Sequence, residues 1–211
     1  MTTRRRHWPL AVATAAIVLA VLVALVARDL RRWEESIVAG DQRFQISPVR
    51  DGLWEPDGWT PTGDLAVSLL GLDDDLRLRE AAQLSRRSRP RSRELRTPKM
   101  LAYATSAQVG FGQVQQSDAP ARLRSVAANE LGVLALAEMV TDPTQARDHA
   151  RRATEKFVEA IRLNSGNVAA HHNLELILTL RQQGRGALEF EDGEGPGTST
   201  GAGSGQGGSG F

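Results

Sequence analysis

The sequence predicts an all-α protein with an N-terminal transmembrane helix, an antiparallel array of helical hairpins and a disordered, glycine-rich tail. Residues 9–27 contain no charged side chain, and apolar residues recur at helical spacing from residue 98 to residue 183. From residue 193 onward, nine of 19 residues are glycine, a composition too poor in apolar surface to offset chain entropy. Aromatic residues make up only 5% of the chain, which argues against an aromatic-rich β-sandwich.

Charge and cysteine content exclude several classes of protein. The 26 basic and 25 acidic side chains leave a formal net charge of +1. This near-neutral balance excludes a strongly basic nucleic-acid-binding protein and an acidic polypeptide that acts through bulk charge. The chain has no cysteine, and therefore no disulfide, thiol nucleophile or cysteine-ligated metal. The paired histidines at 171 and 172 lack the HExxH pattern of a zinc site. We therefore expect a protein that is not an enzyme and that needs no metal or cofactor.

A short basic tail, residues 1–8, precedes an apolar segment, residues 9–27, that is long enough to cross a membrane. As a helix its 19 residues span roughly 28 Å, close to the hydrocarbon core of a bilayer, with Trp8 and Trp33 near the two interfaces. A cleaved signal peptide usually has a shorter apolar region, of about 7–15 residues. An uncleaved anchor is therefore favoured over a signal peptide or a buried core helix. The arginine cluster in the tail predicts a single-pass cell-membrane protein with its N-terminus cytoplasmic and its helical domain outside.

Residues 28–63 predict a juxtamembrane helix followed by an irregular spacer. The helix continues the anchor with charged side chains and is expected to stop at Gly40 and Asp41. Three prolines and three glycines between residues 48 and 63 then rule out a long regular element. Trp54 and Trp59 are expected to pin the spacer to the helical body; the alternative is an aromatic contact surface for a peptide or lipid.

The helical domain, residues 64–184, begins with two short helices. Asp64 is expected to cap the first, and the acidic run 73–75 to start the second, because carboxylates favour the positive end of a helix. A hard cation at this run would need more oxygen ligands than three neighbouring aspartates supply.

A basic loop is expected next, over residues 86–99, with seven basic side chains against one glutamate. It is either a solvated connection or a contact for anionic lipid or an acidic partner. Nucleic acid is less favoured, because no aromatic residue is interleaved for stacking. The contact candidates are Arg86, Arg87, Arg89, Arg91 and Arg93.

Four longer helices, joined by short turns, are expected between residues 98 and 184. In the third, small residues and one phenylalanine recur at spacings of three and four along a single face. This face consists of Ala146, Ala150, Ala153, Phe157 and Ala160. Because small residues let helices approach closely, the phenyl ring is expected to fill the gap between two hairpins.

The small–aromatic–small pattern of Ala153, Phe157 and Ala160 resembles the tetratricopeptide repeat (TPR), a helical hairpin of 34 residues. The Leu131–Gly132 pair matches the first helix of that hairpin, and Leu174 matches the first helix of a following one. Glu175 departs from the pattern, and the run between Gly132 and Ala153 is about nine residues too long. The resemblance is clearest over residues 125–184, and it implies a TPR-like array rather than the alternative, an ordinary four-helix bundle.

A second resemblance involves the whole layout of anchor, tryptophan-containing spacer, hairpins and a glycine-rich tail over residues 185–211. Together with the stretch 157–178, this layout is similar to the membrane-anchored TPR proteins of bacterial MoxR ATPase/von Willebrand A-domain systems. The resemblance implies an accessory or assembly role, with von Willebrand A-domain membrane proteins or a MoxR ATPase as partners.

Two functions are compatible with these features. The favoured one is a membrane-anchored interaction scaffold, whose hairpins bind a protein segment in a groove lined by Asn129, His171 and Glu175. His171 is then expected to be exposed, and Leu174 and Leu178 to be buried. The alternative is a structural component that braces a membrane complex without such a groove, and an enzyme is the third choice.

Overall fold

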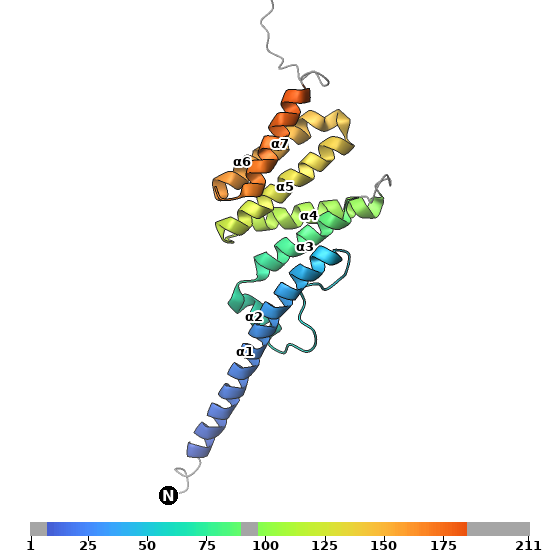
Figure 1. Ribbon diagram of the computed structural model, residues 1–211. Coiled ribbons are helices and arrows are strands. Elements are labelled where there is room, and N and C mark those ends of the chain that lie inside the picture. Colours follow the sequence, from blue (N-terminus) through green and yellow to red (C-terminus); the bar gives the residue numbers. More distant parts are fainter. Residues whose placement is uncertain (1–7, 90–96, 185–211) are drawn as a thin grey trace, which may run out of the picture.

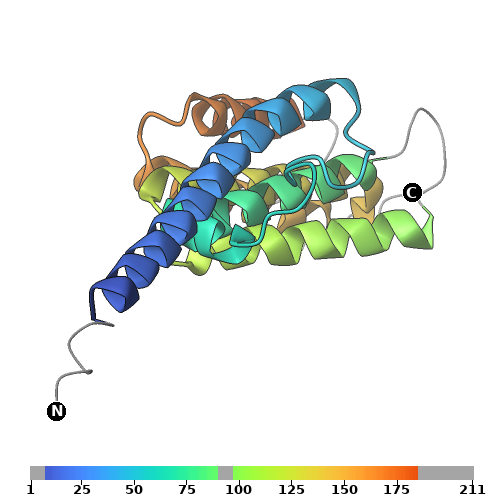
Figure 2. The same ribbon diagram turned by 90° about the horizontal axis from the view of Figure 1, so that it is seen from below.

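The computed structural model describes residues 8–89 and 97–184, and this part of the chain is helical without any β-strand. It confirms the predicted fold class: a long apolar N-terminal helix is followed by an array of helical hairpins. Helix α1 (Trp8–Ile46) projects from the array in Figure 1 and crosses it when seen from below in Figure 2. The arginines of the basic tail and the whole predicted glycine-rich tail, residues 185–211, lie outside the described residues.

Helix α1 is one continuous helix of 39 residues, about 58 Å long at 1.5 Å per residue. Its most apolar stretch has a mean hydropathy of 2.9 and is not covered by any other element. Among the described residues it is the one helix long and apolar enough to cross a membrane. The expected stop at Gly40 and Asp41 is wrong. Gly40 lies inside the helix and is buried against Trp54, whose indole ring a Cβ atom at this position would overlap.

The spacer, residues 47–62, folds back along α1 and leads into the short helix α2 (Gly63–Leu70). Leu53 and Trp54 are buried, as the pinning role requires, but Trp59 is 73% exposed. Asp64 does not cap α2, because Thr62 precedes the helix and Asp64 already lies in its first turn.

Helices α3 (Asp73–Arg87) and α4 (Pro98–Gln116) form the first hairpin of the array. The three aspartates do stand in the first turn of α3, as expected. However, α3 continues to Arg87, so the first part of the predicted basic loop is helical. Residues 90–96 of that loop lie outside the described residues.

Helices α5 (Ala121–Thr141) and α6 (Ala146–Leu163) form the second hairpin, with a short 3₁₀ turn, η1 (Pro143–Gln145), between them. Helix α7 (Val168–Gly184) packs mainly on α6 and completes the array. Figure 1 shows the helices stacked in chain order away from α1. Helices α3 and α7 both contact α5, so the first helix of each hairpin and α7 adjoin one another.

The small-residue face of α6 packs against α5. Phe157 is fully buried, and a Cβ atom at Gly132 would stand only 2.5 Å from its Cε1 atom. Ala153 and Ala160 are also fully buried, while Leu131 is half-buried. Gly132 therefore leaves the space that the phenyl ring fills.

The core side of α7 differs from the expected one. Leu174 is half-buried, but Leu178 is 42% exposed, so its expected burial is wrong. Ala170 and Ile177 are fully buried instead. They lie seven residues apart and so share the helical face that meets the rest of the array.

Candidate interaction surface

Helices α3, α5 and α7 bring a mixed set of polar side chains together. Glu130 on α5 is half-buried, and this burial raises the pKa of its carboxyl group. Arg89, Asn129 and Arg86 act in the opposite direction, because two guanidinium groups and one amide favour the charged form. The arginines at the end of α3 therefore interact electrostatically with the carboxylate in the middle of α5.

Asn129 is not an exposed residue of a groove, as the sequence suggested. Its side chain is only 4% exposed, and its Oδ1 atom accepts a hydrogen bond of 2.9 Å from Nδ2 of Asn173 on α7. Its own Nδ2 atom lies 3.4 Å from Oε1 of Glu130. Asn129 thus joins α5 to α7, and this role was invisible in the sequence because 44 residues separate the two asparagines.

His171 and Glu175 are exposed on α7, but the structure does not bring them together with Asn129. Each lies two residues from Asn173, and residues two apart on a helix point in nearly opposite directions. Instead, the Nε2 atom of His171 donates a hydrogen bond of 3.0 Å to the carbonyl oxygen of Ser165 in the preceding turn. The predicted groove of Asn129, His171 and Glu175 is therefore not formed.

The side of α7 that carries Asn173 also presents apolar side chains. Leu176 and Leu180 are each 41% exposed, and they follow Asn173 at spacings of three and four. With Arg86, Arg89 and Glu130 they make up a surface that we call the first-helix surface: Arg86, Arg89, Glu130, Asn173, Leu176 and Leu180. It combines exposed basic groups at one end with exposed leucines at the other.

The five basic contact candidates do not behave alike. Arg86 and Arg89 are exposed. Arg87 points back to the spacer, where one of its nitrogens donates to the carbonyl oxygen of Val49 at 2.6 Å and to Oδ1 of Asp51 at 2.8 Å. Arg87 therefore ties α3 to the spacer and is not a free contact. Arg91 and Arg93 lie outside the described residues.

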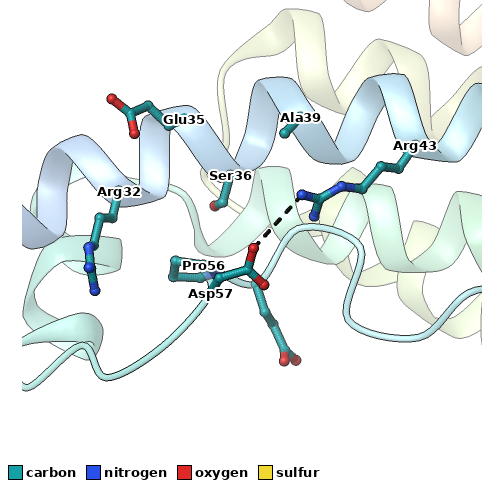
Figure 3. Close-up of a pocket in the computed structure, with 8 residues that line it drawn as sticks. Arg32, Glu35, Ser36, Ala39, Arg43, Pro56 and Asp57 are labelled. Atoms are coloured by element: carbon teal, nitrogen blue, oxygen red, sulfur yellow. Dashed lines mark ion pairs between the residues drawn. The ribbon is translucent and has the colours of Figure 1, made fainter.

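A pocket of about 230 Å³ lies between α1 and the spacer (Figure 3). Arg32 and Arg43 reach towards it from α1, and Arg43 faces Asp57 across it at 3.9 Å. Its one hydroxyl side chain, Ser36, donates to the carbonyl oxygens of Trp33 and Trp54. Three carboxylates, Glu35, Glu55 and Asp57, line the pocket with the two arginines. Since the hydroxyl of Ser36 is already bonded, the pocket holds the spacer on the helix rather than presenting a nucleophile.

One structural group that sequence reasoning missed joins α1 to the array. Asp41 accepts a hydrogen bond of 2.8 Å from the indole nitrogen of Trp54, and two more, of 2.9 and 3.0 Å, from the guanidinium group of Arg79 on α3. The Arg79 bonds, which are its largest influence, hold the pKa of the Asp41 carboxyl below its usual range. No local spacing could have revealed a pair whose members are 38 residues apart.

A second missed group lies between α5 and α6. His149 is 6% exposed, and its Nδ1 atom is 3.2 Å from Oε2 of Glu138. Arg152 approaches the same carboxylate oxygen at 3.4 Å.

Among the described residues no group of three or more histidine, aspartate and glutamate side chains is arranged to hold a metal ion.

Comparison of the chain with protein-family models, with curated proteins and with solved structures finds no match.

Proposed function

We propose that this protein is a membrane-anchored scaffold, whose helical array holds a protein partner at a fixed position relative to the membrane. The observation that supports this most is the first-helix surface, which runs from exposed arginines on α3, through Glu130 and the Asn129–Asn173 hydrogen bond, to exposed leucines on α7. Apolar anchors beside a charged rim are a common arrangement in protein recognition. The partner segment it fits carries apolar side chains for Leu176 and Leu180 and acidic side chains for Arg86 and Arg89.

The anchor in this proposal is the apolar part of α1, residues 9–27. Its side chains are exposed from Leu10 to Ala24, and a free apolar surface of this size is unfavourable in water. The arginine-rich start of the chain favours a cytoplasmic N-terminus and an array on the outer side of the cell membrane. The resemblance of the whole layout to membrane-anchored TPR proteins makes von Willebrand A-domain membrane proteins, or a MoxR ATPase where the array faces the cytoplasm, the partners to test first.

Site-specific photo-crosslinking in intact membranes tests the scaffold. A photoreactive residue at Leu180 should capture a defined partner, and Arg86→Glu with Arg89→Glu should reduce that capture. The matched control places the same probe at Leu178, which is equally exposed on the other side of α7. Equal capture at both positions, or capture that the two arginine substitutions do not reduce, contradicts the assignment to the first-helix surface.

A bracing role without a ligand surface is the second proposal, and the clamp between Asp41 and Arg79 supports it. This clamp and the buried Trp54 couple α1 to α3, so force on the array is transmitted to the membrane helix. In a brace, Asp41→Ala should disturb the assembly of the complex while changes on the first-helix surface leave it intact. The opposite pattern identifies a scaffold.

A carbonate wash at high pH tests the anchor by itself. The full chain should remain in the membrane pellet, and a chain without residues 1–27 should be released. Recovery of the full chain in the wash contradicts the anchor.

A further inference from the structure

Helix α2 begins where the apolar part of α1 ends. The Oδ2 atom of Asp29 accepts two hydrogen bonds of 2.8 Å, from the backbone N–H and from the hydroxyl of Thr62. Asp29 is fully buried and stands two residues after Ala27, the last residue of the uncharged segment. This contact fixes the start of α2 at the level where a membrane-spanning α1 leaves the hydrocarbon core.

Helix α2 lies across α1 rather than along it (Figure 1). Its buried side, which contains Gly63 and Ala66, faces the rest of the protein. The two flanks differ in polarity: Asp64 and Ser68 are exposed on one, and Leu65 and Leu69 are exposed on the other, by 50% and 61%. Spacings of four residues keep each pair on a single flank. A helix this short thus has a polar edge and an apolar edge.

The start of α2 is close to other surface that suits a bilayer. Leu22 of α1, two helical turns before Asp29 and in the uncharged segment, is itself 50% exposed. Trp59, just before α2, is 73% exposed, and its carbonyl oxygen accepts a hydrogen bond of 3.2 Å from Arg32 on α1. Arg28 and Arg31 are exposed at the same end of the anchor, where guanidinium groups attract lipid phosphates.

The tryptophan expected at this interface was Trp33, and the structure favours Trp59. Trp33 is half-buried, and its indole nitrogen is enclosed beside Gly63. The exposed indole of Trp59 is amphipathic, and such rings prefer the headgroup level of a membrane.

We propose that α2 is an interfacial helix, which rests on the bilayer that α1 crosses and inserts Leu65 and Leu69 beside Trp59 into the headgroup region. This inference rests on the proposed membrane anchor. The occupant of the apolar edge is lipid, because α2 starts beside Asp29, where the apolar surface of α1 ends, and because exposed arginines and an exposed tryptophan lie at the same level. A second contact beside a single spanning helix restricts its rotation and tilt, so α2 sets the direction in which the array faces.

Spin labels on the full-length chain in vesicles of phosphatidylcholine and phosphatidylglycerol test the proposal. The chain has no cysteine, so Leu69→Cys, Ser68→Cys, Val18→Cys and Val140→Cys each provide one label without further changes. The Leu69 label should be shielded from a water-soluble nickel chelate and accessible to oxygen, at a depth of about 5–10 Å below the headgroup boundary. The labels at Ser68, on the polar edge of α2, and at Val140, far along the array, should remain accessible to the chelate.

The same labels distinguish failure of α2 from failure of the anchor. If the Val18 label lies in lipid while the Leu69 and Ser68 labels are equally accessible to the chelate, the interfacial helix is wrong and the anchor stands. If the Val18 label is also in water, the anchor is wrong and the interfacial helix with it. A shielded Ser68 label beside an accessible Leu69 label overturns the assignment of the apolar edge.

Discussion

Replacing Gly132 by alanine has two opposing effects on stability: it improves the helix propensity of α5, and it crowds the packing against Phe157. Inside a helix, alanine is normally better than glycine by about 0.5–1 kcal/mol. At Gly132, however, the added Cβ would stand 2.5 and 2.7 Å from the Cε1 and Cδ1 atoms of Phe157. Phe157 is fully buried, so the ring has no open side towards which to move. Overpacking of this kind costs about 1–3 kcal/mol.

Gly112→Ala is the matched control, because a Cβ at this position in α4 meets nothing within 4 Å. The control should gain the propensity term alone, so the two variants should differ by about 1–3 kcal/mol in unfolding free energy. For a chain of this size each kcal/mol corresponds to about 2–4 °C in melting temperature. Thermal unfolding of the full chain in detergent, followed by helical circular dichroism, measures the difference.

A Gly132→Ala variant at least as stable as Gly112→Ala would refute the argument that the α5–α6 contact depends on a missing side chain. A further variant separates crowding from other causes. Phe157→Leu in the Gly132→Ala background removes the ring atoms nearest the new methyl group. This double variant should lose less stability than the sum of the two single changes.

Three further predictions concern single side chains. Phe157→Ala should lower the unfolding free energy by about 3–5 kcal/mol, and an unchanged melting temperature would show that the hairpins do not depend on the ring. Because burial raises the pKa of Glu130, the contribution of Glu130 to stability should be fully present below the usual glutamate range and be lost as pH rises through the raised value. Glu130→Gln should flatten this dependence, and a variant with the wild-type slope would contradict it. Since Arg79 lowers the pKa of Asp41, the stability from their pair should be present above the usual aspartate range and lost as pH falls; Asp41→Asn should remove that loss, with a small effect because Asp41 is half exposed.

The candidate site was only partly predictable from the sequence. Arg86 and Arg89 are exposed, as a contact role requires. Asn129 and Arg87 are instead occupied by long-range hydrogen bonds, to Asn173 and to the spacer. From the sequence alone, a polar residue in a helix gives no indication of whether its side chain faces solvent or a neighbouring helix. Its partner, more than 35 residues away, decides which.

The sequence by itself determined the apolar segment of α1, the helices that follow it and the small-residue face around Phe157, because each depends on local periodicity. Only the tertiary structure decided that α1 continues through Gly40 and that Leu65 and Leu69 form an exposed edge at the end of the anchor. The physical reason is the same in both cases. Glycine weakens a helix, and at Gly40 the indole ring of Trp54, which occupies the space that the missing Cβ leaves, favours its continuation. A leucine is buried only if another element of the chain covers it. Neither the packing of Trp54 on Gly40 nor the exposure of the two leucines can be inferred from the neighbouring residues.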